Sequence, residues 1–316
     1  MLRSMSRASL LLLPLLLTVA CAVRLPPTPD VQVQVESLVR SELPGGSLRV
    51  LHVATTRGRE KIVVQGGGND LLELPVFVYL FEHPTEGPVL IDTGFGRRTA
   101  QDPYDYPGRT ATRALRITME EGAAIADRLP EVGHSVDEVR HIVVTHMHSD
   151  HIGGLEDFPR AALWVARAEW EAADEPGPLG KPDPRPYANH AVVRLVDFTA
   201  TPAYGVFPAH IDLFGDGSLI LLPAPGHTPG HTAVLLNLVG GSFLFTGDAA
   251  WIDRHWQGPE LKGNLVRNLL EDDWELNWIS QWRINAWAAA MPELTIIAGH
   301  ERANLERLRQ WPEAYE

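Results

Sequence analysis

The sequence predicts a globular protein of the mixed α/β class whose functional groups gather at one edge of its sheets. Two observations predict this class. Short apolar runs rich in β-branched residues alternate with stretches of helical periodicity, and several of these runs end in His or Asp beside Gly. The chain of 316 residues is long enough to bury a sizeable core. Its net charge of −13 disfavours nucleic acid as a partner, because binding a phosphate backbone requires clustered Lys and Arg.

The first residues are typical of an export signal rather than of a folded element. Arg3 and Arg7 precede an apolar run from Leu10 that is shorter than the ~20 residues of a membrane-spanning helix. The run ends in LTVAC, which resembles a bacterial lipobox; a plain secreted protein is the alternative. We expect an export signal over residues 1–21, a lipid anchor at Cys21, and a periplasmic or cell-envelope location. As the only cysteine, Cys21 leaves no thiolate or disulfide for the folded domain.

A Pro-rich, polar stretch follows the signal, and we interpret residues 22–46 as a tether that leads into one large domain over residues 47–316. Within that domain, LPVFVYLFE and GPVLIDTG are separated only by HPTE, which predicts a pair of strands. Apolar runs with turn residues on either side predict the other strands. The predicted strands cover 74–82, 87–94, 141–145, 218–223, 232–238, 242–247 and 294–299.

Helices are predicted where apolar positions recur every three or four residues. This period predicts helices over 111–129, over 167–173, from about 260 to 290, and after the last strand. Trp274, Trp278 and Trp282 recur every four residues, so they share one helix face that we expect to pack into the core. Residues 174–186 contain five prolines, which exclude a helix or a central strand and predict a loop.

Four of the predicted strands end in coordinating side chains. They lead into HMHSDH, GHTPGH, GD and GH. Strand ends that meet at one edge of a sheet sandwich would bring these groups together, and the glycines let the backbone turn tightly beside a ligand. Gathering so many carboxylates and imidazoles without a partner costs several kcal/mol per buried charge, in order of magnitude, and divalent cations remove that cost. The sequence therefore predicts a metal site.

The spacing within the first motif assigns two roles. His146 and His148 are two residues apart, so in an extended chain both side chains point the same way and can bind one metal. Asp150 and His151 follow a bend and can face a second metal. Imidazole suits zinc, iron or copper, and carboxylate compensates the charge of the ions.

In this order, THMHSDH, PGHTPGH, TGD and AGH resemble the metallo-β-lactamase-fold hydrolases, over roughly residues 48–305. The resemblance implies an αββα sandwich with two divalent metal ions, expected to be zinc, at one edge. It implies that Asp248 bridges both ions and that Asp92 holds the His loop by hydrogen bonds. His231 is no ligand in that pattern, and we expect it to brace its loop. The implied ligands are His146, His148 and His227 for one ion and Asp150, His151 and His300 for the other.

Longer stretches are similar to the N-acyl-homoserine lactone lactonases. LPVFVYLFEHPTEGPVLIDTGF, VVTHMHSDHIGG and VARAEWEAA match them in order and wording. This similarity implies a small-molecule substrate with an ester-type carbonyl, a lactone. Those lactonases place a Tyr that contacts the substrate carbonyl three residues after the bridging Asp. Trp251 stands there in this chain and donates only an N–H, with a different reach.

Two other functions are alternatives. A glyoxalase II-like thioesterase needs a basic patch for a carboxylate near the end of the chain, but acidic residues are interleaved with Arg302, Arg307 and Arg309. A non-enzymatic metal-binding scaffold is disfavoured because the ligand set is complete. Cysteine-using β-lactamases are excluded by the absence of a cysteine from the domain.

The expected mechanism follows from the metals. A two-metal site holds a bridging hydroxide and can lower the pKa of its water from about 15.7 to ~7, of order 10 kcal/mol toward forming the nucleophile. A positioned general base supplies only ~3–5 kcal/mol. We expect the hydroxide to attack the carbonyl and Asp150 to protonate the leaving alkoxide. Trp251, Trp256 and Tyr187 are candidates for the substrate-binding wall, with core packing as the alternative.

Overall fold

The structure is a computed structural model that describes residues 27, 28, 30, 31, 43–173 and 183–316. The predicted export signal with Cys21, most of the tether and residues 174–182 of the predicted loop lie outside the described residues. No helix in the described part of the chain is long and apolar enough to cross a membrane.

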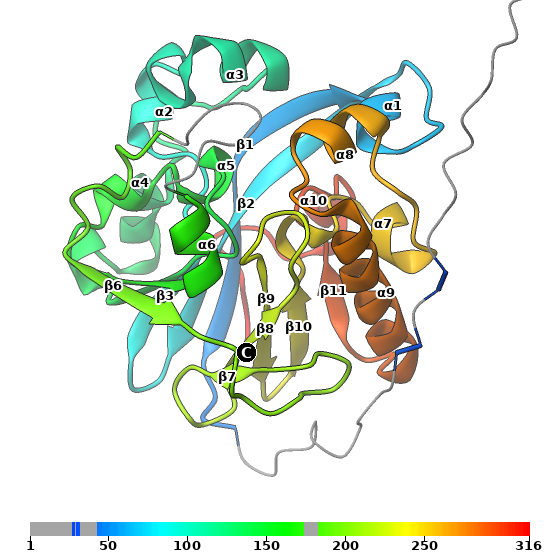
Figure 1. The fold of residues 1–316 in the computed structure, drawn as a ribbon. Coiled ribbons are helices and arrows are strands. Elements are labelled where there is room, and N and C mark those ends of the chain that lie inside the picture. The colour runs from blue at the N-terminus through cyan, green and yellow to red at the C-terminus, as the bar shows by residue number, and fades with distance from the viewer. Residues whose placement is uncertain (1–26, 29, 32–42, 174–182) are drawn as a thin grey trace, which may run out of the picture.

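Two β-sheets occupy the centre of the molecule (Figure 1). The first has the order β12-β1-β2-β3-β4-β5-β6 and the second the order β11-β10-β9-β8-β7. In the first sheet β1, β2 and β3 pair antiparallel, whereas β3, β4, β5 and β6 pair parallel. The strands of the first sheet are β1 (Ser47–Arg59), β2 (Leu71–His83), β3 (Gly87–Ile91), β4 (His141–Val143), β5 (Ala162–Ala166), β6 (Val192–Val196) and β12 (Ala314–Tyr315). Those of the second are β7 (Ile211–Asp212), β8 (Leu219–Pro223), β9 (Thr232–Leu238), β10 (Gly241–Phe245) and β11 (Thr295–Ile297).

Helices cover the outer face of each sheet, with α2 to α6 on one side and α7 to α9 on the other (Figure 1). On the first side they are α2 (Arg97–Gln101), α3 (Arg109–Leu115), α4 (Ile125–Arg128), α5 (Ser149–Ile152) and α6 (Arg167–Ala172). The others are α1 (Glu60–Val63), α7 (Arg254–Gln257), α8 (Asn264–Leu269), α9 (Trp274–Ala290) and α10 (Asn304–Arg307). The predicted αββα sandwich is confirmed.

Three apolar cores lie between these four layers. The middle core joins the two sheets; there the rings of Tyr79 on β2 and Phe245 on β10 are 4.2 Å apart. An outer core packs Ile125 and Ile152 against the first sheet. The other outer core packs Trp287 of α9 against the second sheet. Because both faces of each sheet are covered, the inner strands are almost wholly buried, as their continuous apolar runs predict.

The predicted helix over 111–129 is wrong in its middle. Helix α3 ends at Leu115, and Arg116 adopts a left-handed backbone with φ 51°. Thr118 then pairs with Thr55 of β1 through two backbone hydrogen bonds of 2.8 and 2.9 Å. Pairing with a strand that is distant in sequence overrides the local helical period, and helix resumes only at α4.

The helical region near 260–290 is divided into α8 and α9. The strands β1, β5, β6, β7 and β12 have no counterpart among the predicted strands. Asp273 ends the break by capping α9, because its Oδ1 accepts the N–H groups of Glu275 and Leu276 at 3.0 and 2.9 Å. On the predicted Trp face, Trp278 is buried, whereas Trp274 and Trp282 are half-buried.

Candidate metal centre

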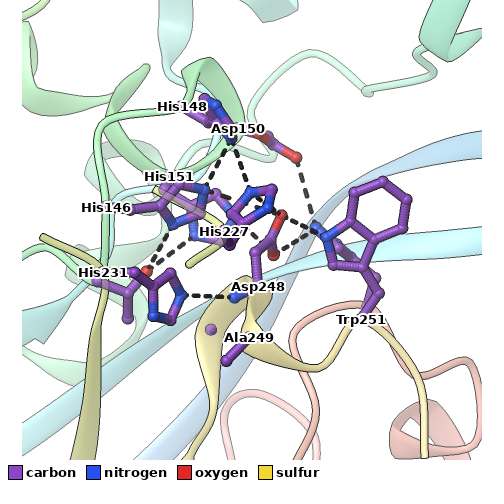
Figure 2. A network of polar contacts seen from close by, with 12 residues as sticks. His146, His148, Asp150, His151, His227, His231, Asp248, Ala249 and Trp251 are labelled. Carbon is purple, nitrogen blue, oxygen red and sulfur yellow. Dashed lines mark hydrogen bonds and ion pairs between the residues drawn. The ribbon is translucent and has the colours of Figure 1, made fainter. Parts of the chain in front are cut away.

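The site forms where strands of both sheets end at one edge of the sandwich. After β4 the chain passes through His146 and His148 into α5, which carries Asp150 and His151. The second sheet contributes the loop after β8, with His227, the turn after β10, with Asp248, and the turn after β11, with His300. Figure 2 shows the imidazoles of His146, His148, His151 and His227 gathered around the carboxylate of Asp248.

Three histidines and Asp248 form one group. Nδ1 of His148 lies 3.0 Å from Nε2 of His146 and 3.0 Å from Nε2 of His227. Oδ2 of Asp248 lies 3.3 Å from Nε2 of His227. Within this group the potential ligand atoms all lie within 4.8 Å of one another. The predicted ligands of the first ion are therefore brought together.

Asp150, His151 and His300 form a second group, whose potential ligand atoms also lie within 4.8 Å of one another. Here Oδ1 of Asp248 is 3.0 Å from Nε2 of His300 and 3.3 Å from Nε2 of His151. One oxygen of Asp248 thus faces each group, which is the arrangement of a carboxylate that bridges two ions.

The donor set fits divalent cations. Nε2 of His151 and Oδ1 of Asp248 are buried and lie 3.3 Å apart, yet neither makes a well-aligned hydrogen bond among the described residues. Buried polar atoms are normally paired, so unpaired ones that converge are suited to an ion. Burial and neighbouring imidazoles lower the pKa of His148 to about 3 and that of His146 well below its usual value. These two imidazoles therefore favour the neutral form that coordinates a metal. At His151 and His300 burial lowers the pKa, but the nearby carboxylates, Asp248 above all for His300 and Asp92 for His151, outweigh it and raise the pKa, so a metal there would displace a proton. The two groups of ligands together suit two divalent metals.

Asp92 is hydrogen-bonded to the loop that carries His146. Its Oδ1 accepts the backbone N–H of Thr145 at 2.7 Å, and its Oδ2 accepts the Thr145 hydroxyl at 2.9 Å. The same Oδ2 lies 2.7 Å from Nδ1 of His151, so the carboxylate favours the tautomer whose Nε2 lone pair faces Asp248. Asp92 has a left-handed φ of 57°, a strained conformation that Asp and Asn tolerate better than most residues.

His231 lies behind the carboxylate of Asp248 and outside both ligand groups. Its Nε2 accepts the backbone N–H of Asp248 at 2.9 Å. Gly247 makes this approach possible: its φ is +48°, and a Cβ there would lie 2.6 Å from His231 Nε2. The structure thus places His231 where it braces the turn that presents Asp248.

Of the three aromatic candidates, Trp251 contacts one of the predicted metal ligands. Its Nε1 donates to Asp248 Oδ2 at 2.7 Å, and its ring lies 6.2 Å from the rings of both His227 and His300, measured between centroids. Tyr187 packs in a T-shaped contact on Trp170 in an outer core. Trp256 packs against the other outer core and donates to Asp253 at 3.0 Å. Substrate-binding roles for Tyr187 and Trp256 stay predictions.

Three buried charged residues contact the site although no sequence pattern predicts a role for them there. Glu169 accepts the backbone N–H groups of Met147 at 2.8 Å and Gly230 at 3.0 Å, and so ties the two His loops together. Lys262 and Glu271 form an ion pair beside His227. No spacing or periodicity distinguishes Lys262 from a surface lysine. Glu169 lies within VARAEWEAA, one of the stretches similar to the lactonases, and this similarity is the one sequence signal that points to it.

Comparison with known proteins agrees with this geometry. The Metallo-beta-lactamase superfamily profile matches residues 71–290. The N-acyl homoserine lactonase AttM of Rhizobium johnstonii is 30% identical over 260 residues, which are 79% of this chain and 90% of that protein. The N-acyl homoserine lactonase AiiA of Bacillus thuringiensis subsp. kurstaki is 29% identical over 210 residues, 64% of this chain and 77% of AiiA.

A similar fold occurs in an N-acyl homoserine lactone hydrolase solved with the product N-hexanoyl-L-homoserine at its catalytic metal center. The two structures superpose with a TM-score of 0.71 at 24% identity, over 86% of this chain and 100% of that one.

Proposed function

This chain belongs to the metallo-beta-lactamase superfamily, and on that premise we propose that it opens the ester ring of a lactone of the N-acyl-homoserine type, using two zinc ions. The chain is a metal-dependent hydrolase by family and by ligand set. The observation that carries the proposal is the position of Asp248 between two complete ligand groups, in a chain that spans 90% of a lactonase.

The ligand chemistry favours zinc. Five imidazoles and two carboxylates, without a thiolate, suit a borderline divalent ion. When bound, a pair of such ions acidifies water and polarises an ester carbonyl. His146, His148 and His227 would hold one ion, Asp248 would be shared, and the remaining ligands would hold the other.

The indole of Trp251 lines the site and does not donate a hydrogen bond to the substrate. Its single N–H is engaged by Asp248 Oδ2 at 2.7 Å, so it offers the substrate carbonyl an indole face and no free hydrogen-bond donor. The departure from the lactonase Tyr therefore alters how the carbonyl is bound. We expect apolar contact with the indole to orient the substrate instead.

Asp150 is suited to deliver a proton. Its side chain is 14% exposed, whereas those of His300 and Asp248 beside it are 5% and 4% exposed, so it is the carboxyl of the site that an entering substrate can reach. Asp150 would take up the proton that the attacking water gives up and pass it to the ring oxygen as the ester bond breaks, which avoids release of a free alkoxide.

The glyoxalase II-like alternative gains no support at the end of the chain. Arg302 pairs with Glu306 at 3.0 Å, and Arg307 pairs with Asp253 at 2.7 Å. These guanidinium groups are already engaged by acids, which disfavours them as the receptor for a substrate carboxylate.

A substrate panel tests the proposal. The full-length protein, purified and reconstituted with zinc, is assayed with an acyl-homoserine lactone, a thioester, a phosphodiester and a β-lactam, alongside metal analysis of the same sample. We expect two ions per chain and the highest kcat/KM with the lactone. Two bound ions with a preference for the thioester or phosphodiester would reject the lactone assignment.

The proposal extends to the location of the protein. Export and lipid attachment at Cys21 are supported by the apolar run and LTVAC. Expression of the natural chain and of Cys21→Ser, followed by separation of membrane and soluble fractions, tests this. We expect only the natural chain in the membrane fraction; equal partitioning would argue against the anchor.

A further inference from the structure

We propose that Lys262 and Glu271 form a positioning pair that fixes the ligating nitrogen of His227 and supports the turn that presents Asp248. The pair touches the metal centre from behind, opposite the side where the ions would lie. The inference rests on the metal site of the proposed function but not on the identity of the substrate.

Glu271 determines which nitrogen of His227 carries the proton. Its Oε1 lies 3.2 Å from His227 Nδ1, whereas His227 Nε2 faces His148 Nδ1 at 3.0 Å and Asp248 Oδ2 at 3.3 Å. A carboxylate at Nδ1 favours a proton there and leaves the lone pair of Nε2 directed at the metal position. The contact between Glu271 Oε1 and His227 Nδ1 therefore orients the imidazole of His227.

Lys262 is the cation that Glu271 balances. Its side chain is fully buried, and its Nζ lies 2.5 Å from Glu271 Oε1 and 2.5 Å from the backbone oxygen of Asp248. It also lies 4.9 Å from the centroid of the Trp251 ring, whose N–H donates to the Asp248 carboxylate. Lys262 therefore supports Asp248 at its backbone and through its aromatic neighbour.

The two charges have to occur together. Lys262 Nζ is also 3.4 Å from His227 Nδ1. Without Glu271, the ammonium would become the donor to Nδ1, and His227 would carry its own proton on Nε2, where the metal must bind. Glu271 attracts the ammonium more closely and offers His227 an acceptor in its place.

The backbone holds Glu271 at this position. The N–H of Asp272 donates to the carbonyl of His227 at 3.1 Å, and the N–H of Asp273 donates to the carbonyl of Gly226 at 2.9 Å. Gly226 has a φ of +126°, and a Cβ there would lie 2.0 Å from the backbone nitrogen of Asn277. The segment between α8 and α9 is thus packed directly on the His227 loop, which explains the break between the two helices.

A structural role alone would not require this pair. Removing one partner of a buried ion pair is strongly destabilising, but replacing both by apolar side chains of similar size is often neutral or stabilising. The double variant Lys262→Met/Glu271→Leu therefore separates the two roles, because it keeps the packing and removes the acceptor for His227.

The test compares this double variant with the natural full-length protein and with a matched control. The control, Arg254→Met/Glu260→Leu, makes the same kind of change at an exposed ion pair whose contacts are to Glu60 and to each other. Thermal unfolding of the metal-free proteins reports on folding. Zinc titration against a competing chelator gives the affinity of each ion, without any substrate.

We expect the double variant to unfold near the natural temperature when metal-free, yet to bind one of its two ions about 10–100-fold more weakly, the usual effect of losing an outer hydrogen-bond partner. The control should bind both ions normally. A double variant with natural stability and natural affinity for both ions would overturn the inference.

Two single variants keep the inference falsifiable if the double variant does not fold. Glu271→Gln retains an oxygen that can accept from His227, whereas Glu271→Leu does not, so zinc affinity should fall further in the second. Equal affinities in these two variants would overturn the inference. Because zinc affinity is measured without substrate, a natural protein that binds two ions but opens no lactone would reject the proposed function alone.

Discussion

The indole nitrogen of Trp251 donates a hydrogen bond of 2.7 Å to Oδ2 of Asp248, the carboxylate that lies between the two groups of metal ligands. A neutral N–H directed at a buried carboxylate fixes its rotation and reduces its charge density. The ring of Trp251 and the geometry of the bridge are therefore coupled, although Trp251 is no ligand itself.

Trp251→Phe isolates that hydrogen bond, because it keeps an aromatic ring and removes the donor. Hydrogen bonds to charged groups contribute about 1.5–3 kcal/mol, so we expect kcat/KM for the lactone to fall by roughly 10–100-fold. Steady-state kinetics of zinc-saturated protein measure the effect, with bound zinc determined on the same sample. Unchanged kcat/KM would mean that the N–H does not influence the bridge.

Asp92→Asn tests the support of the second ligand group. Asn tolerates the left-handed φ of 57° at this position, so backbone strain is not the variable. In the natural protein, Oδ2 of Asp92 lies 2.7 Å from Nδ1 of His151. The variant loses the negative charge at this position, and we expect about 10–100-fold weaker binding of one ion. Zinc titration against a chelator reports this. Thr93→Ser, a mild change at the next residue, is the control and should bind zinc normally.

Much of this site was predictable because each ligand follows a strand that the local pattern reveals. The runs before His146, His227, Asp248 and His300 are apolar and short, and their ends meet because the sheets stack. The motif spacing then groups His146 with His148, as the structure does. The periodicity therefore predicts the class of fold, and the motifs with their family resemblance predict the edge of the sandwich and the seven grouped residues.

The parts that were not predictable depend on contacts between distant segments. The helix expected at 111–129 is interrupted because Thr118 pairs with Thr55, a partner more than sixty residues away that no local window contains. Lys262 and Glu271 meet only because α8 turns the chain back toward His227. A charged residue that becomes buried by tertiary packing has the same local sequence pattern as a solvent-exposed one.

Glu169→Gln should loosen the junction of the two His loops. The natural carboxylate accepts two backbone N–H groups with its two oxygens, but an amide has one oxygen and would turn its NH2 toward the other N–H. An unsatisfied buried donor costs about 1–3 kcal/mol, and we expect the free energy of unfolding of the metal-free protein to fall by that amount. Urea unfolding measures it. Glu171→Gln, on the exposed side of α6, should be unchanged.

Asp150→Asn tests the proton donor by its dependence on the leaving group. A positioned acid contributes roughly 10²–10⁴-fold, so kcat for lactones, whose leaving group is a basic alkoxide, should fall by about that factor at saturating zinc. Esters of acidic phenols need no proton and should lose much less. Normal metal content with a normal lactone rate, or equal losses on both classes of ester, would exclude Asp150 as the donor.

Asp157 gives a prediction on pH that does not involve the metal ligands. Its side chain is only 11% exposed, and burial raises its pKa to about 6, although the backbone N–H and the guanidinium of Arg97 oppose the rise. Because the folded state holds this proton more tightly than the unfolded state does, the stability linked to it is complete below pH ~4 and is lost as the pH rises to about 6.

Asp157→Asn removes this titration. We therefore expect the free energy of unfolding of the variant, relative to the natural protein, to rise between pH 4 and 6 by up to about 3 kcal/mol and to stay constant above. Urea unfolding of both metal-free proteins across this range measures the difference. Asp127→Asn, which removes another carboxylate bonded to Arg97 at 2.7 Å, controls for loss of the ion pair alone. Parallel pH profiles for Asp157→Asn and the natural protein would show that Asp157 ionises normally in the fold.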